Sequence, residues 1–337
     1  MRVSVIGVVS MGRRHISVLL KLGLDLVGIV DVSQQSLEEA KRHFSLNKEL
    51  LFDDINRLMA KVIPDCLIIA TTANSHCDLA CQAAKLGVKY ILVEKPMAVS
   101  LEECERMLST CEKYGAQISV NHQMRFLDQY SMPKALLNSD AYGGFQSMTV
   151  VGGNFGMSMN GTHYLEAFRY ISEEDPFEVT AWFDTGAVSN PRGDQFKDVA
   201  GSIRVTTSSG KRLYMEIGSG QGHGLEVLYA ARNGLISVSE LNGKMTATVR
   251  SPEFKELPTT RYGMPAESTS LLIAPVEVID STAKVLNALF KDDCRVTGEQ
   301  GMMAIKVLVA AYVSAENGNR PVQLDHQLDR FRVFPWA

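Results

Sequence analysis

The segment Glu94-Lys95-Pro96 places a carboxylate, an amine and a proline directly after the apolar run Tyr90 to Val93. An unbroken apolar run of this kind is typical of a buried strand in a parallel sheet, and ligands bind at the carboxyl ends of such strands. Pro96 favours an extended backbone at Lys95 and so restricts the direction of its side chain. An isolated Glu-Lys pair is more often a solvated strand end, so the chemistry of Lys95 depends on what precedes it.

A glycine turn near the N-terminus is the second candidate site. The run Arg2 to Ile6 predicts a short strand that stops at Gly7, and a helix is predicted from Gly12. The turn matches the dinucleotide motif G-x-G-x-x-G at its first and last glycine, and Val9 replaces the middle one. Loop amides and the helix dipole favour an anion, although a structural turn is the alternative. The predicted cofactor contacts here are Gly7, Val9, Ser10, Met11, Gly12 and Arg13, of which Arg13 adds positive charge.

An acidic residue follows at the spacing that a dinucleotide site requires. The next strand, Leu26 to Val30, ends at Asp31, which lies 19 residues past Gly12. A spacing of about 20 residues puts a carboxylate on the adenosine ribose. The same charge repels the 2′-phosphate of NADP, and no arginine follows in residues 32–34 to neutralise it. The sequence therefore predicts NAD rather than NADP.

Strands and helices alternate through the first 122 residues, which predicts a doubly wound parallel sheet of the Rossmann type. The remaining four strands are predicted at Leu51-Phe52, Asp65 to Ala70, Tyr90 to Val93 and Gln117 to Val120. After about Gln123 the crossover helices disappear, so we expect a second domain over residues 123–337 with an open, mainly antiparallel sheet. Its strands are predicted at 145–151, 178–184, 201–206, 212–217, 225–230, 235–239 and 245–249. Helices over about 271–290 and 298–316 are predicted to cover it.

Composition excludes several classes of partner and compartment. The chain has 337 residues, 45% of them hydrophobic, and a net charge of −4, which argues against nucleic acid or an anionic membrane. Six scattered cysteines predict free thiols in a reducing compartment. The four-residue gap between Cys77 and Cys81 could suggest a metal pair, but no second cluster of His and Cys accompanies it. No apolar run is long enough to cross a bilayer, so a cytoplasmic protein is expected.

Several of these features together resemble the Gfo/Idh/MocA oxidoreductases, in order over nearly the whole chain. They are the glycine turn, Thr72 with Asn74 and His76, Glu94-Lys95-Pro96, and the segment Gly298 to Gly318. The resemblance implies a second domain whose sheet often forms dimers or tetramers. It also implies further cofactor contacts at Thr71, Thr72, Asn74, His76, Glu94 and Lys95.

The resemblance also implies a catalytic histidine at the start of a helix in the second domain, where His163 lies. Lys95 and His163 then flank the substrate beside the nicotinamide. The family's frequent aspartate four residues earlier is Met159 here, and Glu166 replaces another aspartate. Asn160 can contact substrate but cannot accept a proton. Arg125 and Tyr164 are further substrate candidates, with surface or packing roles as the alternative.

Oxidation of a secondary alcohol requires hydride departure to the nicotinamide and removal of the hydroxyl proton. We expect Lys95 to polarise the oxygen, His163 to accept or relay the proton, and Glu94 to orient Lys95 or the carboxamide of the cofactor. The predicted function is NAD-dependent hydride transfer on a sugar, cyclitol or nucleotide-sugar, a substrate class that rests on the resemblance. Two alternatives stay open: a non-catalytic sensor or regulatory member, and a redox-neutral NAD-dependent glycosidase.

Overall fold

The computed structural model describes residues 1–153, 155–186, 188, 190, 192–218, 220–275, 277–324 and 328–336. These residues group into two compact units. The first unit comprises Met1–Gln123, Glu277–Ile305 and Asp329–Ala337, and the second comprises Met124–Val276 and Lys306–Leu328. Two later segments of the chain thus return to the N-terminal unit, whereas the sequence analysis drew a single boundary after residue 122.

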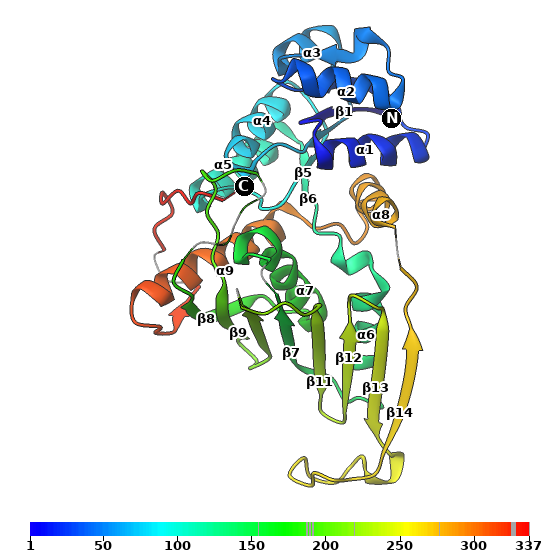
Figure 1. The fold of residues 1–337 in the computed structure, drawn as a ribbon, viewed down its shortest axis with the longest axis vertical. Helices are drawn as coiled ribbons and strands as arrows, with labels where there is room; N and C mark the ends of the chain where they lie inside the picture. The colour runs from blue at the N-terminus through cyan, green and yellow to red at the C-terminus, as the bar shows by residue number, and fades with distance from the viewer. Residues whose placement is uncertain are drawn as a thin grey trace. The chain divides into compact units, whose positions relative to one another are not determined.

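The first unit contains the predicted parallel sheet of six strands, in the order β3-β2-β1-β4-β5-β6 (Figure 1). The strand order reverses between β1 and β4, and this switch point is where ligands bind in open α/β sheets. Strands β4 and β5 are almost entirely buried aliphatic residues, as expected for central parallel strands. The bounds are β1 (Arg2–Ile6), β2 (Asp25–Val30), β3 (Leu51–Phe52), β4 (Cys66–Ile69), β5 (Tyr90–Val93) and β6 (Gln117–Val120).

Helices connect these strands and pack on the sheet. Helix α8 packs against α1, and α4 packs against α5. The side chain of Asn56 on α3 accepts a hydrogen bond of 2.6 Å from Gln82 on α4. Ser100 caps α5 by accepting from the N–H of Glu103 at 3.1 Å. The bounds are α1 (Ser10–Lys21), α2 (Gln34–Phe44), α3 (Ile55–Lys61), α4 (Ala73–Lys85), α5 (Leu101–Tyr114) and α8 (Val278–Lys291).

Helix α4 begins at Ala73, so Asn74 and His76 lie on its first turn. The helix predicted over about residues 271–290 needs correction. The helix expected from Leu271 begins only at Val278, because Pro275 interrupts the chain and the residues before it form a strand. Helix α8 also packs on α1 and β5 within the first unit, so the prediction that it covers the antiparallel sheet is wrong.

The second unit contains a sheet of nine strands in the order β14-β13-β12-β11-β7-β10-β9-β8-β15 (Figure 1). All neighbouring strands are antiparallel except β7 and β10, which confirms the predicted fold class. Sequence patterns missed β14, whose residues are all exposed, and β15, which has two residues. The bounds are β7 (Phe145–Gly152), β8 (Pro176–Phe183), β9 (Gly201–Thr207), β10 (Arg212–Ile217), β11 (Glu226–Ala231), β12 (Gly234–Ser239), β13 (Lys244–Arg250), β14 (Ala266–Leu272) and β15 (Val322–Gln323).

Three helices complete the fold: α6 (Asp128–Leu137), α7 (Thr162–Ser172) and α9 (Gly298–Glu316). Helix α7 packs on β7 and is preceded by one turn of π-helix, Met157–Gly161. No helix in the described part of the chain has the length and apolar character needed to cross a membrane. The face of β8 and β10 exposes Trp182 and Tyr214. Association of copies through this sheet stays a prediction.

The turn between β1 and α1 generates a stability test. A Cβ atom at Gly12 would lie 1.7 Å from the carbonyl oxygen of Gly7, a backbone atom that cannot move aside. We expect Gly12→Ala to lower the free energy of unfolding by about 3 kcal/mol or more. The matched control is Gly222→Ala, because a Cβ atom there meets nothing within 4 Å. Urea denaturation of both variants measures the difference, and equal stabilities would contradict this account of the turn.

Candidate cofactor and active site

The glycine turn leaves an open helix terminus at the switch point of the sheet. Gly7 adopts a φ of +82°, and a Cβ atom on it would lie 2.7 Å from the carbonyl oxygen of Ala70. Helix α1 begins after Val9 and has no side-chain cap within the described residues. Its first amides are therefore available to an anion such as a pyrophosphate. The Val9 side chain is 60% exposed, so it stands over the turn and not in the core.

Asp31 lies beside this turn, at the carboxyl end of β2, where the sequence predicts it. One carboxylate oxygen accepts from the N–H of Val8 at 2.9 Å, and the other accepts from the N–H of Ser33 at 2.8 Å. Asp31 thus ties the turn to the start of α2. Each oxygen retains a second acceptor site, so the geometry is compatible with a ribose hydroxyl.

Arg13, a predicted cofactor contact, forms two contacts within the first unit. Its Nε–H donates to the carbonyl oxygen of Val8 at 3.1 Å, and its Nη2 lies 2.5 Å from a carboxylate oxygen of Glu39 on α2. The guanidinium therefore links the turn to α2. Its charge is compensated by Glu39, which weakens the prediction that Arg13 serves a phosphate group.

Thr71, Thr72, Asn74 and His76 lie at the carboxyl end of β4, next to the turn in the sheet order. His76 is fully buried, with Nε2 at 3.1 Å from the carbonyl oxygen of Thr71 and Nδ1 at 3.1 Å from that of Pro96. Burial lowers the pKa of His76, and its backbone hydrogen bonds partly oppose this shift. The ring thus holds the segment after Lys95, whereas Thr72 donates to the exposed Asn74 side chain at 2.7 Å.

Glu94 is the buried centre of the first unit's site. Its Oε1 accepts from His15 Nε2 at 2.7 Å and from Asn121 Nδ2 at 2.7 Å. Burial alone raises the pKa of Glu94, but the hydrogen bond from His15, the charge of Lys95 and the amide of Asn121 lower it to about 2. An ionised carboxylate only accepts, so His15 carries its proton on Nε2. Sequence analysis missed both His15 and Asn121.

Lys95 follows at the carboxyl end of β5 and is half-buried, and its peptide bond to Pro96 is cis. The N–H of Lys95 donates to Glu94 Oε2 at 3.3 Å. One carboxylate therefore contacts α1, β6 and the backbone of Lys95. This arrangement supports the prediction that Glu94 orients the lysine.

In the second unit, Asn160 and His163 lie one turn apart where the π-helix meets α7. Both are half-buried, and the Asn160 amide donates to the carbonyl oxygen of Phe155 at 3.1 Å. The buried Asp198 accepts from the N–H of Ser158 at 2.9 Å and from that of Met159 at 2.8 Å. A carboxylate distant in sequence thus contacts the backbone of this turn. Asp198 caps the turn, and its oxygens are occupied by backbone amides.

Arg125 and Tyr164 both direct their polar groups to acids of the second unit. Arg125 pairs with Glu166, and both side chains are buried. Burial raises the pKa of Glu166, and the charge and hydrogen bond of Arg125 act against it. The Tyr164 hydroxyl donates to Glu240 Oε2 at 3.0 Å, and that of Tyr130 donates to Oε1. These contacts favour the packing role for Tyr164.

Lys95 belongs to the first unit and His163 to the second, so their joint action on one substrate stays a prediction. Of the residues that sequence analysis missed, His15 had a signal, because it lies three residues after Gly12 on the predicted first helix. Asn121 directly follows the sixth predicted strand. Asp198 and Glu240 had no recognisable motif.

Residues 1–122 match the Gfo/Idh/MocA model, an oxidoreductase family with an NAD-binding Rossmann fold. Glucose-6-phosphate 3-dehydrogenase of Bacillus subtilis is 30% identical over 151 residues, which are 44% of this chain and 41% of that protein. Inositol 2-dehydrogenase/D-chiro-inositol 3-dehydrogenase of Lacticaseibacillus casei is 32% identical over 109 residues, 32% of this chain and 31% of its own length. The chain thus matches less than half the length of these curated relatives.

The fold of the whole chain also has solved counterparts. An oxidoreductase from Agrobacterium radiobacter, in complex with NAD+, L-tartaric acid and magnesium, superposes with a TM-score of 0.81. The two sequences are 20% identical, and the alignment covers 96% of this chain and 98% of the other. This similarity establishes a shared fold.

The depressed pKa of Glu94 predicts a pH dependence of stability. Because the folded-state value, about 2, lies below the ordinary value of 4.5, the stabilisation is complete above about pH 4.5 and is lost as the pH falls through 2. We expect wild type to lose up to about 3 kcal/mol over this range through Glu94. Glu94→Gln cannot titrate and should lack this component.

Urea denaturation at a series of pH values between about 7 and 2 measures the two curves. Glu112→Gln, at an exposed position on α5, is the matched control and should retain the wild-type pH dependence. Parallel curves for wild type and Glu94→Gln would contradict the ionised state assigned to Glu94.

Proposed function

Because this chain carries the NAD-binding Rossmann domain of the Gfo/Idh/MocA oxidoreductase family, we propose that it transfers a hydride between a nicotinamide dinucleotide and a hydroxyl or keto carbon of a sugar, cyclitol or nucleotide-sugar. The observation that carries this proposal is the N-terminus of α1 at the sheet's switch point, which no side chain among the described residues caps, with Lys95 at the carboxyl end of β5. The substrate class is supported by the dehydrogenases of glucose-6-phosphate and inositol that the chain resembles.

The residues of the first unit fit a dinucleotide. Gly7 and Gly12 keep the turn clear of side chains close to the backbone, and the first amides of α1 bind the pyrophosphate. Asp31 accepts from a ribose hydroxyl, and its negative charge disfavours a 2′-phosphate, so NAD is the proposed cofactor. When bound, the nicotinamide supplies the hydride acceptor or donor.

Lys95 is proposed to hold a positive charge beside the reacting oxygen of the substrate. The neighbouring Glu94 carboxylate is buried and ionised, and it therefore stabilises the ammonium form of Lys95. The ammonium group stabilises negative charge that develops on the oxygen. His163 is proposed to accept the hydroxyl proton, with Asn160 as a hydrogen-bonding contact of the substrate.

A second candidate function is a ligand-binding protein without turnover. Two observations favour it: the exposed Val9 side chain at the pyrophosphate turn, and the absence at Met159 of a carboxylate that could assist His163. Asp198 does not replace that carboxylate as a base, because it caps the backbone of residues 158 and 159.

Calorimetric titration with NAD and with NADP tests cofactor binding. We expect NAD to bind with a dissociation constant in the micromolar range. NADP should bind at least about tenfold more weakly. Asp31→Asn retains an acceptor oxygen for a backbone amide but loses the charge, so it should reduce the preference for NAD. If neither dinucleotide binds, the oxidoreductase proposal fails. Recovery of NAD binding in Val9→Gly would then assign the loss to that side chain.

Lys95→Ala tests the catalytic assignment. We expect NAD affinity to change by less than about tenfold and turnover of a reactive sugar or cyclitol to fall by at least about 10²-fold. Lys89→Ala, at an exposed position just before the same strand, is the matched control and should leave both quantities unchanged. Steady-state absorbance of NADH measures turnover. Equal rates in wild type and Lys95→Ala would remove Lys95 from the mechanism.

A further inference from the structure

A cavity of about 330 Å³ lies on the first unit beside α4, and it contains a cysteine next to two basic side chains. It is formed by residues of α3, α4 and α5 and the residue after α4. Its lining includes Asp78, Cys81, Gln82, Lys85, Arg106 and Thr110. None of these residues belongs to the proposed cofactor or substrate site.

Cys81 is one of two thiols on the same face of α4. Cys77 and Cys81 lie four residues apart, one helical turn, and their side chains hydrogen-bond to each other. Both sulfurs also lie close to α5, with Cys77 Sγ 3.3 Å from the carbonyl oxygen of Glu103 and Cys81 Sγ 3.6 Å from that of Arg106. Cys77 is 1% exposed and Cys81 6%, and only Cys81 lines the cavity.

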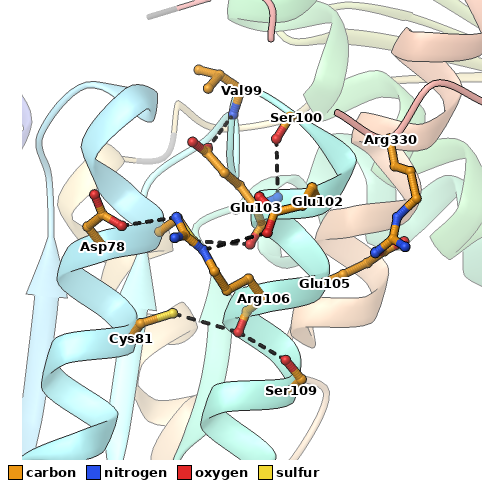
Figure 2. Close-up of polar contacts among 11 residues, drawn as sticks. Asp78, Cys81, Val99, Ser100, Glu102, Glu103, Glu105, Arg106, Ser109 and Arg330 are labelled. Atoms are coloured by element: carbon orange, nitrogen blue, oxygen red, sulfur yellow. Dashed lines mark hydrogen bonds and ion pairs between the residues drawn. The ribbon is translucent and has the colours of Figure 1, made fainter. Parts of the chain in front are cut away.

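A fixed guanidinium lies against this pair. The Nε–H of Arg106 donates to Cys77 Sγ at 3.1 Å, and its Nη2 donates to Asp78 Oδ1 at 3.0 Å. Figure 2 shows Arg106 reaching from α5 toward Asp78 on α4, with Glu102 at 4.0 Å from its Nε. Held at several points, the guanidinium places a fixed positive charge beside the cysteine pair, and a charge of this kind stabilises a thiolate.

The electrostatic balance favours one ionised thiol. The hydrogen bond from Cys77 lowers the pKa of Cys81, burial raises it, and Thr110, Arg106 and Lys85 lower it further, so the net shift is downward. The hydrogen bond with Cys81 and burial raise the pKa of Cys77.

Two other buried thiols have the opposite property. Burial raises the pKa of Cys104, and burial together with the charge of Cys81 raises that of Cys111 to about 12. The Cys77–Cys81 pair on α4 therefore differs from ordinary buried cysteines, which are inert.

We propose that Cys81, supported by Cys77 and Arg106, is a site of covalent oxidation by hydrogen peroxide and other small hydroperoxides. The Cys81 thiolate attacks one peroxide oxygen, so that an S–O bond forms and the O–O bond breaks. The sulfur is oxidised to a sulfenic acid. The departing hydroxide is protonated by the solvent and leaves as water. Cys77 keeps its proton and donates a hydrogen bond to the sulfur that reacts.

Helix geometry decides the product. Residues one turn apart have Cβ atoms roughly 5–6 Å apart, whereas a disulfide needs about 3.5–4.5 Å. A bond between Cys77 and Cys81 would require α4 to open locally. The sulfenic acid therefore persists in the cavity, where an external thiol can reach it and form a mixed disulfide with loss of water.

Trapping with dimedone, followed by peptide mass spectrometry, tests the proposal on the full chain treated with dilute hydrogen peroxide. We expect Cys81 to be labelled at least about tenfold faster than the exposed Cys294, and Cys104 to remain unlabelled. Arg106→Gln should slow labelling of Cys81 about tenfold without changing that of Cys294. Lys113→Gln, which removes an exposed charge from the same helix, should have no effect.

Labelling of Cys81 no faster than that of Cys294 would overturn the proposal, as would an unchanged rate in folded Arg106→Gln. If that variant fails to fold, the pH dependence of alkylation by iodoacetamide in wild type decides. The site is supported if the alkylation rate of Cys81 reaches its midpoint at least about one pH unit below the midpoint for Cys294. An equal or higher midpoint overturns it.

Discussion

The first unit depends on a buried negative charge. The Glu94 carboxylate is buried at the end of a central strand. An ionised carboxylate without partners there would lower the free energy of unfolding by several kcal/mol. His15 from α1 and Asn121 from the end of β6 supply hydrogen bonds to it, each contributing roughly 1.5–3 kcal/mol to a charged acceptor. The carboxylate therefore joins three elements that are distant in sequence. It also determines the electrostatic environment of Lys95, the residue next to it.

A second set of contacts controls the backbone around Lys95. His76, on the first turn of α4, lies with its ring nitrogens 3.1 Å from the carbonyl oxygens of Pro96 and Thr71. Asp31 has a comparable role at the glycine turn, where it accepts from Val8 and Ser33. Residues that resemble cofactor contacts in sequence thus also build the loops that would hold a cofactor. Binding and local stability are coupled in both places.

Three acids in the second unit are used differently. Asp198 caps the turn before α7, Glu166 pairs with Arg125, and Glu240 accepts from two tyrosines. Burial raises the pKa of all three carboxyl groups, and their partners act against this shift. These acids determine where α7 begins and how it packs. His163 thus lies on a helix that is held at its start and along its buried face.

Sequence by itself determined the parallel sheet, most antiparallel strands, α9, the glycine turn and the position of Lys95, because each has a local period or a short motif. It failed where partners are distant in sequence. Asp198 accepts a hydrogen bond from Ser158, which is 40 residues away in the sequence, and Glu94 hydrogen-bonds to His15, which is 79 residues away. It also failed for β14, whose exposed residues have no apolar alternation, and for α8, whose own pattern cannot say which unit it packs on. Tertiary structure decided these features because long-range hydrogen bonds and packing choose a partner that no local pattern encodes.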